Sequence, residues 1–169
     1  MKLLTSFCLL LTSLTTTIHA HDATPNVHTK RDNMKIPNQT ELLRMANSLS
    51  TNDTSPSFSR VSPNVTWDVL GTHQAAGHYT SLASWKKNAL GEIQKVLDEP
   101  LRLSVRNVIG GRPQNWAVLE LEAHSECLNG LPYDQDYAWV MRFNEEGIIV
   151  HVRAYLDSAL VQRAIEENT

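Results

Sequence analysis

The chain holds few of the residues that build disulfide scaffolds and nucleic-acid surfaces. It has two cysteines in 169 residues, too few for a disulfide-rich framework. Its 15 Lys and Arg are outnumbered by 18 Asp and Glu, for a formal net charge of −3, which disfavours contact with phosphate backbones. It also lacks a glycine-rich phosphate-binding motif and an internal repeat. These absences disfavour nucleic-acid partners and nucleotide cofactors, and the length suits a single core.

The first twenty residues are similar to a secretory signal peptide. Lys2 leads into an apolar run around Phe7 to Leu11, and the small residue Ala20 offers a cleavage point. The run is too short to span a bilayer, so we expect no membrane segment after its removal. Residues 1–20 therefore predict export. Cys8 would be lost with this segment, which leaves Cys127 alone as a small buried residue at a strand end.

Residues 21–40 are predicted to be a propeptide or linker. The pair Lys30-Arg31 looks like a site for kexin-type processing proteases, and a solvated basic pair without processing is the alternative. Sequons begin at Asn38, Asn52 and Asn64, and each is a candidate glycan acceptor in an exported chain. The folded domain is expected over residues 41–169.

The order of helical and β patterns predicts an α+β domain. Apolar residues recur at helical spacing over Glu41–Leu49 and Ser81–Leu97, and a final helix is expected from Asp157 to Ile165. Strand patterns cover residues 65–70, 101–109 and 116–126, followed by two runs after Asn129-Gly130 that turn at Glu146-Gly147. Helices therefore come first, and a curved antiparallel sheet follows.

This order resembles the cone-shaped fold shared by nuclear transport factor 2, SnoaL-like polyketide cyclases, scytalone dehydratase and ketosteroid isomerase. The stretches Gly71-Thr72-His73, Asn129-Gly130-Leu131-Pro132-Tyr133 and Val152-Arg153-Ala154-Tyr155-Leu156-Asp157 are similar to fungal secreted SnoaL-like proteins. The resemblance covers Glu41 to the C-terminus. It implies N-terminal helices packed on a strongly curved antiparallel (mixed) sheet, a short C-terminal helix, and chemistry that needs no cofactor.

The resemblance also suggests a catalytic carboxylate. The run from Asp68 to Gly77 resembles, without a gap, the strand that delivers the general base of ketosteroid isomerases, a carboxylate at the pocket mouth that moves a proton beside a carbonyl. The alternative is that Asp68 binds backbone N–H groups before Gly71. Trp139 stands where the family has a second acid, and no tyrosine precedes Tyr79. These departures keep open a non-catalytic binding protein with a vestigial pocket.

A second set of candidate residues alternates along one predicted strand. Glu120, Glu122 and His124 share one face. In the isomerase register this face lines the cavity, and His124 beside Glu122 is then a base near neutral pH. The alternative places the intervening Ala and Leu side chains in the core and the charges in solvent. The sequence leaves both placements open.

The remaining candidates suit an apolar binding pocket. His73, His78 and Tyr79 lie in a loop expected at its entrance, and aromatic residues can form its wall, with core packing as the alternative. No histidine spacing is typical of a zinc site, so no metal is expected.

We therefore expect a small hydrophobic carbonyl ligand of polyketide or terpenoid type, which the protein isomerises, cyclises or dehydrates. Asp68 and His124 are the catalytic candidates, and Tyr79, Trp85, Trp139, Glu122, His73 and Tyr137 are the binding candidates. Arg153 and Tyr155 are expected on the outer sheet face, where a C2 homodimer would bury them.

Overall fold

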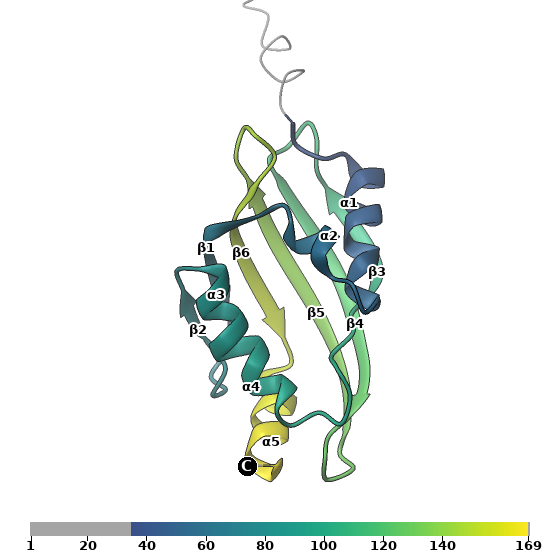
Figure 1. Ribbon diagram of the computed structural model, residues 1–169, viewed down its shortest axis with the longest axis vertical. Coiled ribbons are helices and arrows are strands. Elements are labelled where there is room, and N and C mark those ends of the chain that lie inside the picture. Colours follow the sequence, from purple (N-terminus) through teal and green to yellow (C-terminus); the bar gives the residue numbers. More distant parts are fainter. Residues whose placement is uncertain (1–34, 169) are drawn as a thin grey trace, which may run out of the picture.

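The computed structural model describes residues 35–168, which form a six-stranded sheet with helices packed across one face (Figure 1). The strands are β1 Val61–Val69, β2 Gly77–Tyr79, β3 Ser104–Gly110, β4 Trp116–Glu126, β5 Pro132–Phe143 and β6 Ile149–Leu156. Their spatial order is β2-β1-β6-β5-β4-β3. Only the β1–β6 pair is parallel among these neighbours. The α+β class with a mixed, unclosed sheet is therefore confirmed.

The described residues also contain short helical segments. They are α1 Gln39–Ala46, η1 Asn47–Ser50, α2 Ser55–Phe58, α3 Leu82–Trp85, η2 Lys86–Leu90, α4 Gly91–Gln94 and α5 Ser158–Asn168. Within residues 35–168, no helix is long and apolar enough to cross a membrane. The predicted signal peptide and the Lys30-Arg31 pair lie outside the described residues.

Helix α1 begins where its sequence provides a cap. The side chain of Asn38 accepts the backbone N–H of Glu41, whose carboxylate accepts the N–H of Asn38 in return, a reciprocal pair that satisfies free helix N–H groups. Leu42 and Met45 are buried on one face of the helix. The helix predicted over residues 41–49 is therefore present, extended by two residues at its start and finished by the tighter turn η1.

The predicted helix over residues 81–97 is observed as α3, η2 and α4 in one continuous run to Gln94. The hydroxyl of Ser81 accepts the N–H of Ser84 and caps the start. Trp85, Ala89 and Ile93 recur at four-residue spacing and are buried. The middle segment η2 is a π-type turn, a geometry that is often found beside functional sites. Its first segment, α3, packs against β1, and its last segment, α4, packs against α5.

Strict alternation decides which face of the sheet is the inner one. In β4 the residues Ala117, Leu119, Leu121 and Ala123 are each at most 2% exposed, so they pack under the helices, and the intervening side chains point outward. In β3 the register shifts between Val105 and Asn107. The alternation predicted for that strand breaks there, which leaves Ile109 exposed at 47%.

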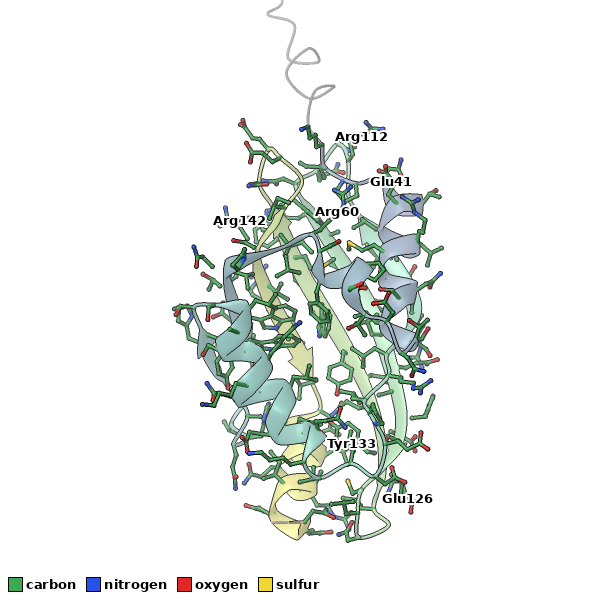
Figure 2. The ribbon with its side chains drawn as sticks, in the orientation of Figure 1. Glu41, Arg60, Arg112, Glu126, Tyr133 and Arg142 are labelled. Atoms are coloured by element: carbon green, nitrogen blue, oxygen red, sulfur yellow. The ribbon has the colours of Figure 1, made fainter. Side chains whose placement is uncertain are left out.

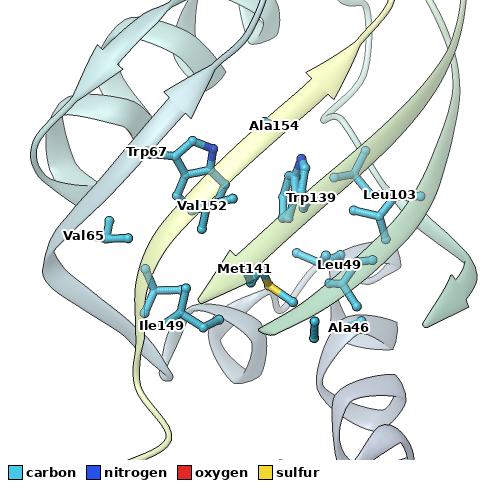
Figure 3. Close-up of a cluster of buried hydrophobic side chains, with 14 of the residues drawn as sticks. Ala46, Leu49, Val65, Trp67, Leu103, Trp139, Met141, Ile149, Val152 and Ala154 are labelled. Carbon is cyan, nitrogen blue, oxygen red and sulfur yellow. The ribbon is translucent and has the colours of Figure 1, made fainter. Parts of the chain in front are cut away.

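The core under the helices is centred on three indoles. Trp67 stacks on Trp85 with ring centroids 3.8 Å apart, and Trp139 meets both rings edge-on. Figure 3 shows Trp67 and Trp139 among aliphatic side chains from β5, β6 and the first helices. Burying each such aromatic contributes about 2 kcal/mol or more relative to exposure.

Candidate functional site

A cavity of about 110 Å³ lies between the inner sheet face, the α3–α4 run and α5. Most of its wall is aliphatic or aromatic. Its polar side chains are Thr54, His73, Tyr133 and Tyr137, together with the indole N–H groups. Among the described residues, the wall contains no Asp, Glu, Lys or Arg. The cavity is close in size to one that holds a single benzene ring, and its chemistry suits an uncharged, largely apolar ligand.

Among the described residues, His73 is the one imidazole in the wall of this cavity. It lies in the loop between β1 and β2, is 4% exposed, and neither of its ring nitrogens has a hydrogen-bond partner among the described residues. Burial lowers the pKa of His73, and the Leu70 carbonyl, which lies outside hydrogen-bond geometry, opposes this only in part. The imidazole is therefore neutral near pH 7, with one nitrogen able to take a proton and the other able to donate one.

Two tyrosines on β5 supply hydroxyl groups to the same cavity. Tyr133 and Tyr137 are four positions apart in the sequence, and their hydroxyl oxygens lie 3.1 Å apart. Burial raises the pKa of Tyr133 and raises that of Tyr137 well above its ordinary value, so both stay protonated. One of the two protons serves the bond between them, and the other can be donated to a ligand oxygen. Tyr133 lies at the end of the sheet near α4 and α5 (Figure 2).

The aromatic wall offers one further buried donor. The indole nitrogen of Trp67 is buried and has no hydrogen-bond partner among the described residues. In Figure 3 the nitrogens of Trp67 and Trp139 lie on the ring edges toward Ala154, which lines the cavity, and away from Met141. Trp85 also lines the cavity.

Four of the predicted binding residues therefore share one cavity, namely His73, Trp85, Tyr137 and Trp139. Tyr79 does not line it. The Tyr79 hydroxyl donates to the carbonyl of Ala75 at 3.0 Å and so ties down the loop that carries His73.

The predicted place of Asp68 at the cavity mouth is wrong. Its neighbours Trp67 and Val69 point into the core, so strand alternation turns Asp68 to the outer face. Its carboxylate oxygens lie 2.6 Å from His78 Nδ1 and 2.7 Å from His151 Nε2, and histidines rather than loop N–H groups satisfy it. Burial alone would raise the pKa of Asp68, but the hydrogen bonds from the two histidines outweigh this and lower it.

Of the two placements left open for Glu122 and His124, the structure shows the one outside the cavity, because both project from the outer face of β4. Glu122 pairs with Arg106 at 2.7 Å, and His124 pairs with Asp134 at 2.8 Å in an exposed position. The hydrogen bond to Asp134 raises the pKa of His124. The apolar side chains of β4 occupy the core instead, which leaves the charges in solvent.

Sequence reasoning missed Tyr133 as a cavity residue. It shares odd numbering with Tyr137 and Trp139, and strand alternation along β5 would have placed all three on one face.

Two predicted glycan acceptors, Asn52 and Asn64, are exposed, whereas the side chain of Asn38 caps α1. Within residues 35–168, no three His, Cys, Asp or Glu side chains are arranged to hold a metal ion.

The sequence of this chain is similar to those of two curated proteins. No protein-family model matches the chain. Dimerizing cyclase phiC from a fungal species is 29% identical over 118 residues, 69% of this chain and 52% of that protein. Dimerizing cyclase tstC from Talaromyces stipitatus is 27% identical over 137 residues, 80% of this chain and 60% of that protein. The chain thus spans little more than half the length of these curated relatives.

Solved structures agree on the architecture. An NTF2-like protein from Burkholderia thailandensis superposes with a TM-score of 0.62 at 16% identity, covering 76% of this chain and 98% of that one. TerC, co-crystallised with polyporic acid, superposes with a TM-score of 0.60 at 19% identity, covering 75% and 96%. The chain therefore has the NTF2-like, ketosteroid-isomerase-like fold predicted from its sequence. Its homologues by sequence are fungal dimerizing cyclases.

Proposed function

We propose that this protein is a cofactor-independent cyclase or isomerase that acts on a small hydrophobic carbonyl compound in the inner cavity. The observation that carries the proposal is His73, a buried neutral imidazole with unpartnered nitrogens in a wall without carboxylates. Two relatives that bear the name dimerizing cyclase and the polyporic acid complex of TerC support a small-molecule reaction.

The chemistry begins with a proton transfer. His73 takes a proton from the carbon beside the carbonyl, and the electron pair of that C–H bond forms an enolate. The enolate oxygen accepts the spare hydrogen bond of the Tyr133–Tyr137 pair, which is worth more in a dry cavity than in water. Because both tyrosines stay protonated, the hydroxyl whose proton is not used in the bond between them can donate to this oxygen.

The fate of the enolate separates the two reaction types. In an isomerisation, protonated His73 returns the proton to a different carbon. In a cyclisation, the enolate carbon forms a bond to an electrophilic carbon, and the proton on His73 passes to the atom that receives the displaced electron pair. For this chain we propose the second course, as the names of its relatives suggest.

Proton abstraction can be tested before the natural substrate is known. Cyclohexanone has one ring and an uncharged carbonyl, so it suits the cavity, and its exchange of hydrogen for deuterium in heavy water is measurable by proton NMR. We expect the protein to accelerate this exchange and His73→Gln to slow it by roughly a hundredfold or more. His124→Gln, on the exposed outer face, is the matched control and should exchange like the parent protein. Equal rates in the parent protein and His73→Gln would remove His73 from the mechanism.

A non-catalytic ligand-binding protein is the second candidate. It is favoured by the outward position of Asp68 and by Trp139 at the place of the family's second acid. The three indoles beside the cavity report occupancy through their fluorescence. Quenching by a carbonyl ligand without any acceleration of exchange would favour this candidate over the enzyme.

We also propose that two copies associate through the outer sheet face. Arg153 lies there with its Nε buried and without a hydrogen-bond partner among the described residues, over the ring of Trp116. Asp134 and Asp136 lie toward one end of β5, and Arg142 lies near the other. A two-fold axis through the middle of the strand would bring the opposite charges together.

Export remains a proposal of the same kind. Its support is the apolar N-terminal segment and the exposure of Asn52 and Asn64. Two measurements on protein recovered from the culture medium test export. One is its N-terminal sequence, and the other is its mass before and after enzymatic removal of glycans. An unprocessed, unglycosylated cytoplasmic product would contradict it.

A further inference from the structure

We infer that the C-terminal helix α5 holds His73 in position and that Gln162 is the positioning residue. This inference rests on the proposed function, because it assigns how that site keeps its base in place. Three sets of contacts carry it, one at each end of the His73 loop and one where α5 begins.

The first contact joins α5 to the residue after His73. The backbone N–H of Gln74 donates to Oε1 of Gln162 at 2.9 Å, across 88 residues of sequence. Nε2 of Gln162 donates in turn to Glu166 one turn further along the helix, which orients the amide with its oxygen toward the loop. The carbonyl of His73 accepts the N–H of Ala76 and closes a tight turn. The backbone on the C-terminal side of His73 is thereby fixed.

The second contact lies on the other side of the imidazole. Gly71 has a φ of +124°, a conformation that residues with side chains rarely adopt. A Cβ atom at this position would collide with the hydroxyl of Ser158, the first residue of α5, and would lie 3.1 Å from Cδ2 of His73. The backbone of Gly71 is therefore packed between α5 and the imidazole, so the helix supports the ring through a residue without a side chain.

The third set of contacts ties α5 to the strand that carries the tyrosines. Gln135, 2% exposed between Tyr133 and Tyr137, donates to the carbonyl of Asp157 at 3.1 Å and accepts its N–H at 2.8 Å. The Asp157 carboxylate accepts the N–H groups of residues 159 and 160 and caps the helix. A continuous series of contacts thus runs from β5 through α5 to the loop. It sets the place of His73 relative to the two hydroxyl groups, which is the geometry that proton transfer and enolate stabilisation both require.

The experiment removes the acceptor and keeps the length of the side chain. In Gln162→Met the loop loses its bond to the helix, and we expect cyclohexanone exchange to slow by roughly tenfold to a hundredfold. We also expect the NMR titration of His73, assigned by its absence from His73→Gln, to move up toward pH 6.5 as the ring gains solvent. The double variant Gln162→Glu with Glu166→Gln keeps an oxygen acceptor for Gln74 and the hydrogen bond between the two side chains of the helix, and it should retain most of the exchange rate. Arg163→Ala, which removes an exposed ion pair with Glu167 on the same helix, is the matched control.

The outcomes separate the inference from the proposal beneath it. If His73→Gln exchanges like the parent protein, the proposed function fails. If His73→Gln is inactive but Gln162→Met keeps both the exchange rate and the titration of His73, the positioning role is refuted. It is also refuted if Gln162→Met lowers exchange only as far as it lowers the folded fraction, or if the double variant slows exchange as much as Gln162→Met does.

Discussion

Replacing His73 by Leu should make the protein more stable while it abolishes proton abstraction. The imidazole is 4% exposed and both of its nitrogens lack partners among the described residues. Burying a polar group without a hydrogen bond costs about 1–3 kcal/mol. Leu has no polar atom and can pack against the aliphatic wall, so we expect a gain of about 1–2 kcal/mol in the free energy of unfolding. The midpoint of thermal unfolding should rise by roughly 3–6 °C.

The assay is urea unfolding followed by tryptophan fluorescence, at several pH values. Because the pKa of His73 is lowered in the folded state, the unfolded chain takes up this proton first as the pH falls below about 6.5. The contribution of neutral His73 to the stability of the parent protein is therefore fully present above pH 6.5, and it is lost as the pH falls toward the lowered pKa of the folded state. His73→Leu lacks this loss, so its advantage should widen in the same window.

The opposite result would refute the reasoning. If His73→Leu is less stable than the parent by 1 kcal/mol or more, with the same dependence on urea, the imidazole makes a structural bond. His124→Leu is the control, because that histidine is exposed and paired with Asp134. It should show no gain in stability.

Further outcomes follow from the two faces of the sheet. Asp68→Asn should lower the free energy of unfolding by about 1 kcal/mol at pH 7. Because the pKa of Asp68 is lowered in the folded state, this deficit should vanish in acid as the carboxylate of the parent protein is protonated. Cyclohexanone exchange should not change, and a large loss of exchange would return Asp68 to the mechanism. Benzaldehyde should quench the indole fluorescence at concentrations at least about tenfold lower than benzoate does, because the cavity wall has no charged side chain to pair with a carboxylate. Equal binding of the two compounds would contradict the proposal that the ligand is uncharged. Arg153→Glu should shift sedimentation from dimer to monomer, and unchanged sedimentation of a parent dimer would exclude this face. Gly71→Ala should destabilise the fold by about 2 kcal/mol or more, measured by urea unfolding; a neutral effect would mean that the loop moves freely.

The fold was predictable from the sequence because its elements are strongly periodic. The helix beginning near Glu41 has a capping pair and a regular apolar face, and β4 alternates without interruption. Strand β3 was only partly predictable. Its register shift depends on pairing with β4, and a local pattern of apolar residues does not contain that information.

Several residues of the site could be predicted from the sequence, but the sheet face to which each side chain points was harder to predict. His73, Tyr137, Trp85 and Trp139 were singled out and do line the cavity. Asp68 was assigned from family resemblance, but a strand turns successive side chains to opposite faces, so the buried indole of Trp67 commits its neighbour to the outside. Pairing with two histidines from other strands cannot be read from spacing alone.

The parallel pairing of β1 with β6 has a consequence for the order of folding. Val61–Val69 finds its neighbours in the short β2 and in residues 149–156, near the other end of the chain. The ribosome must therefore make residues 149–156 before Trp67 can reach its final surroundings. Such distant pairings are slow to form, so Trp67 should stay exposed in the newly made chain until β6 has left the ribosome and paired with β1.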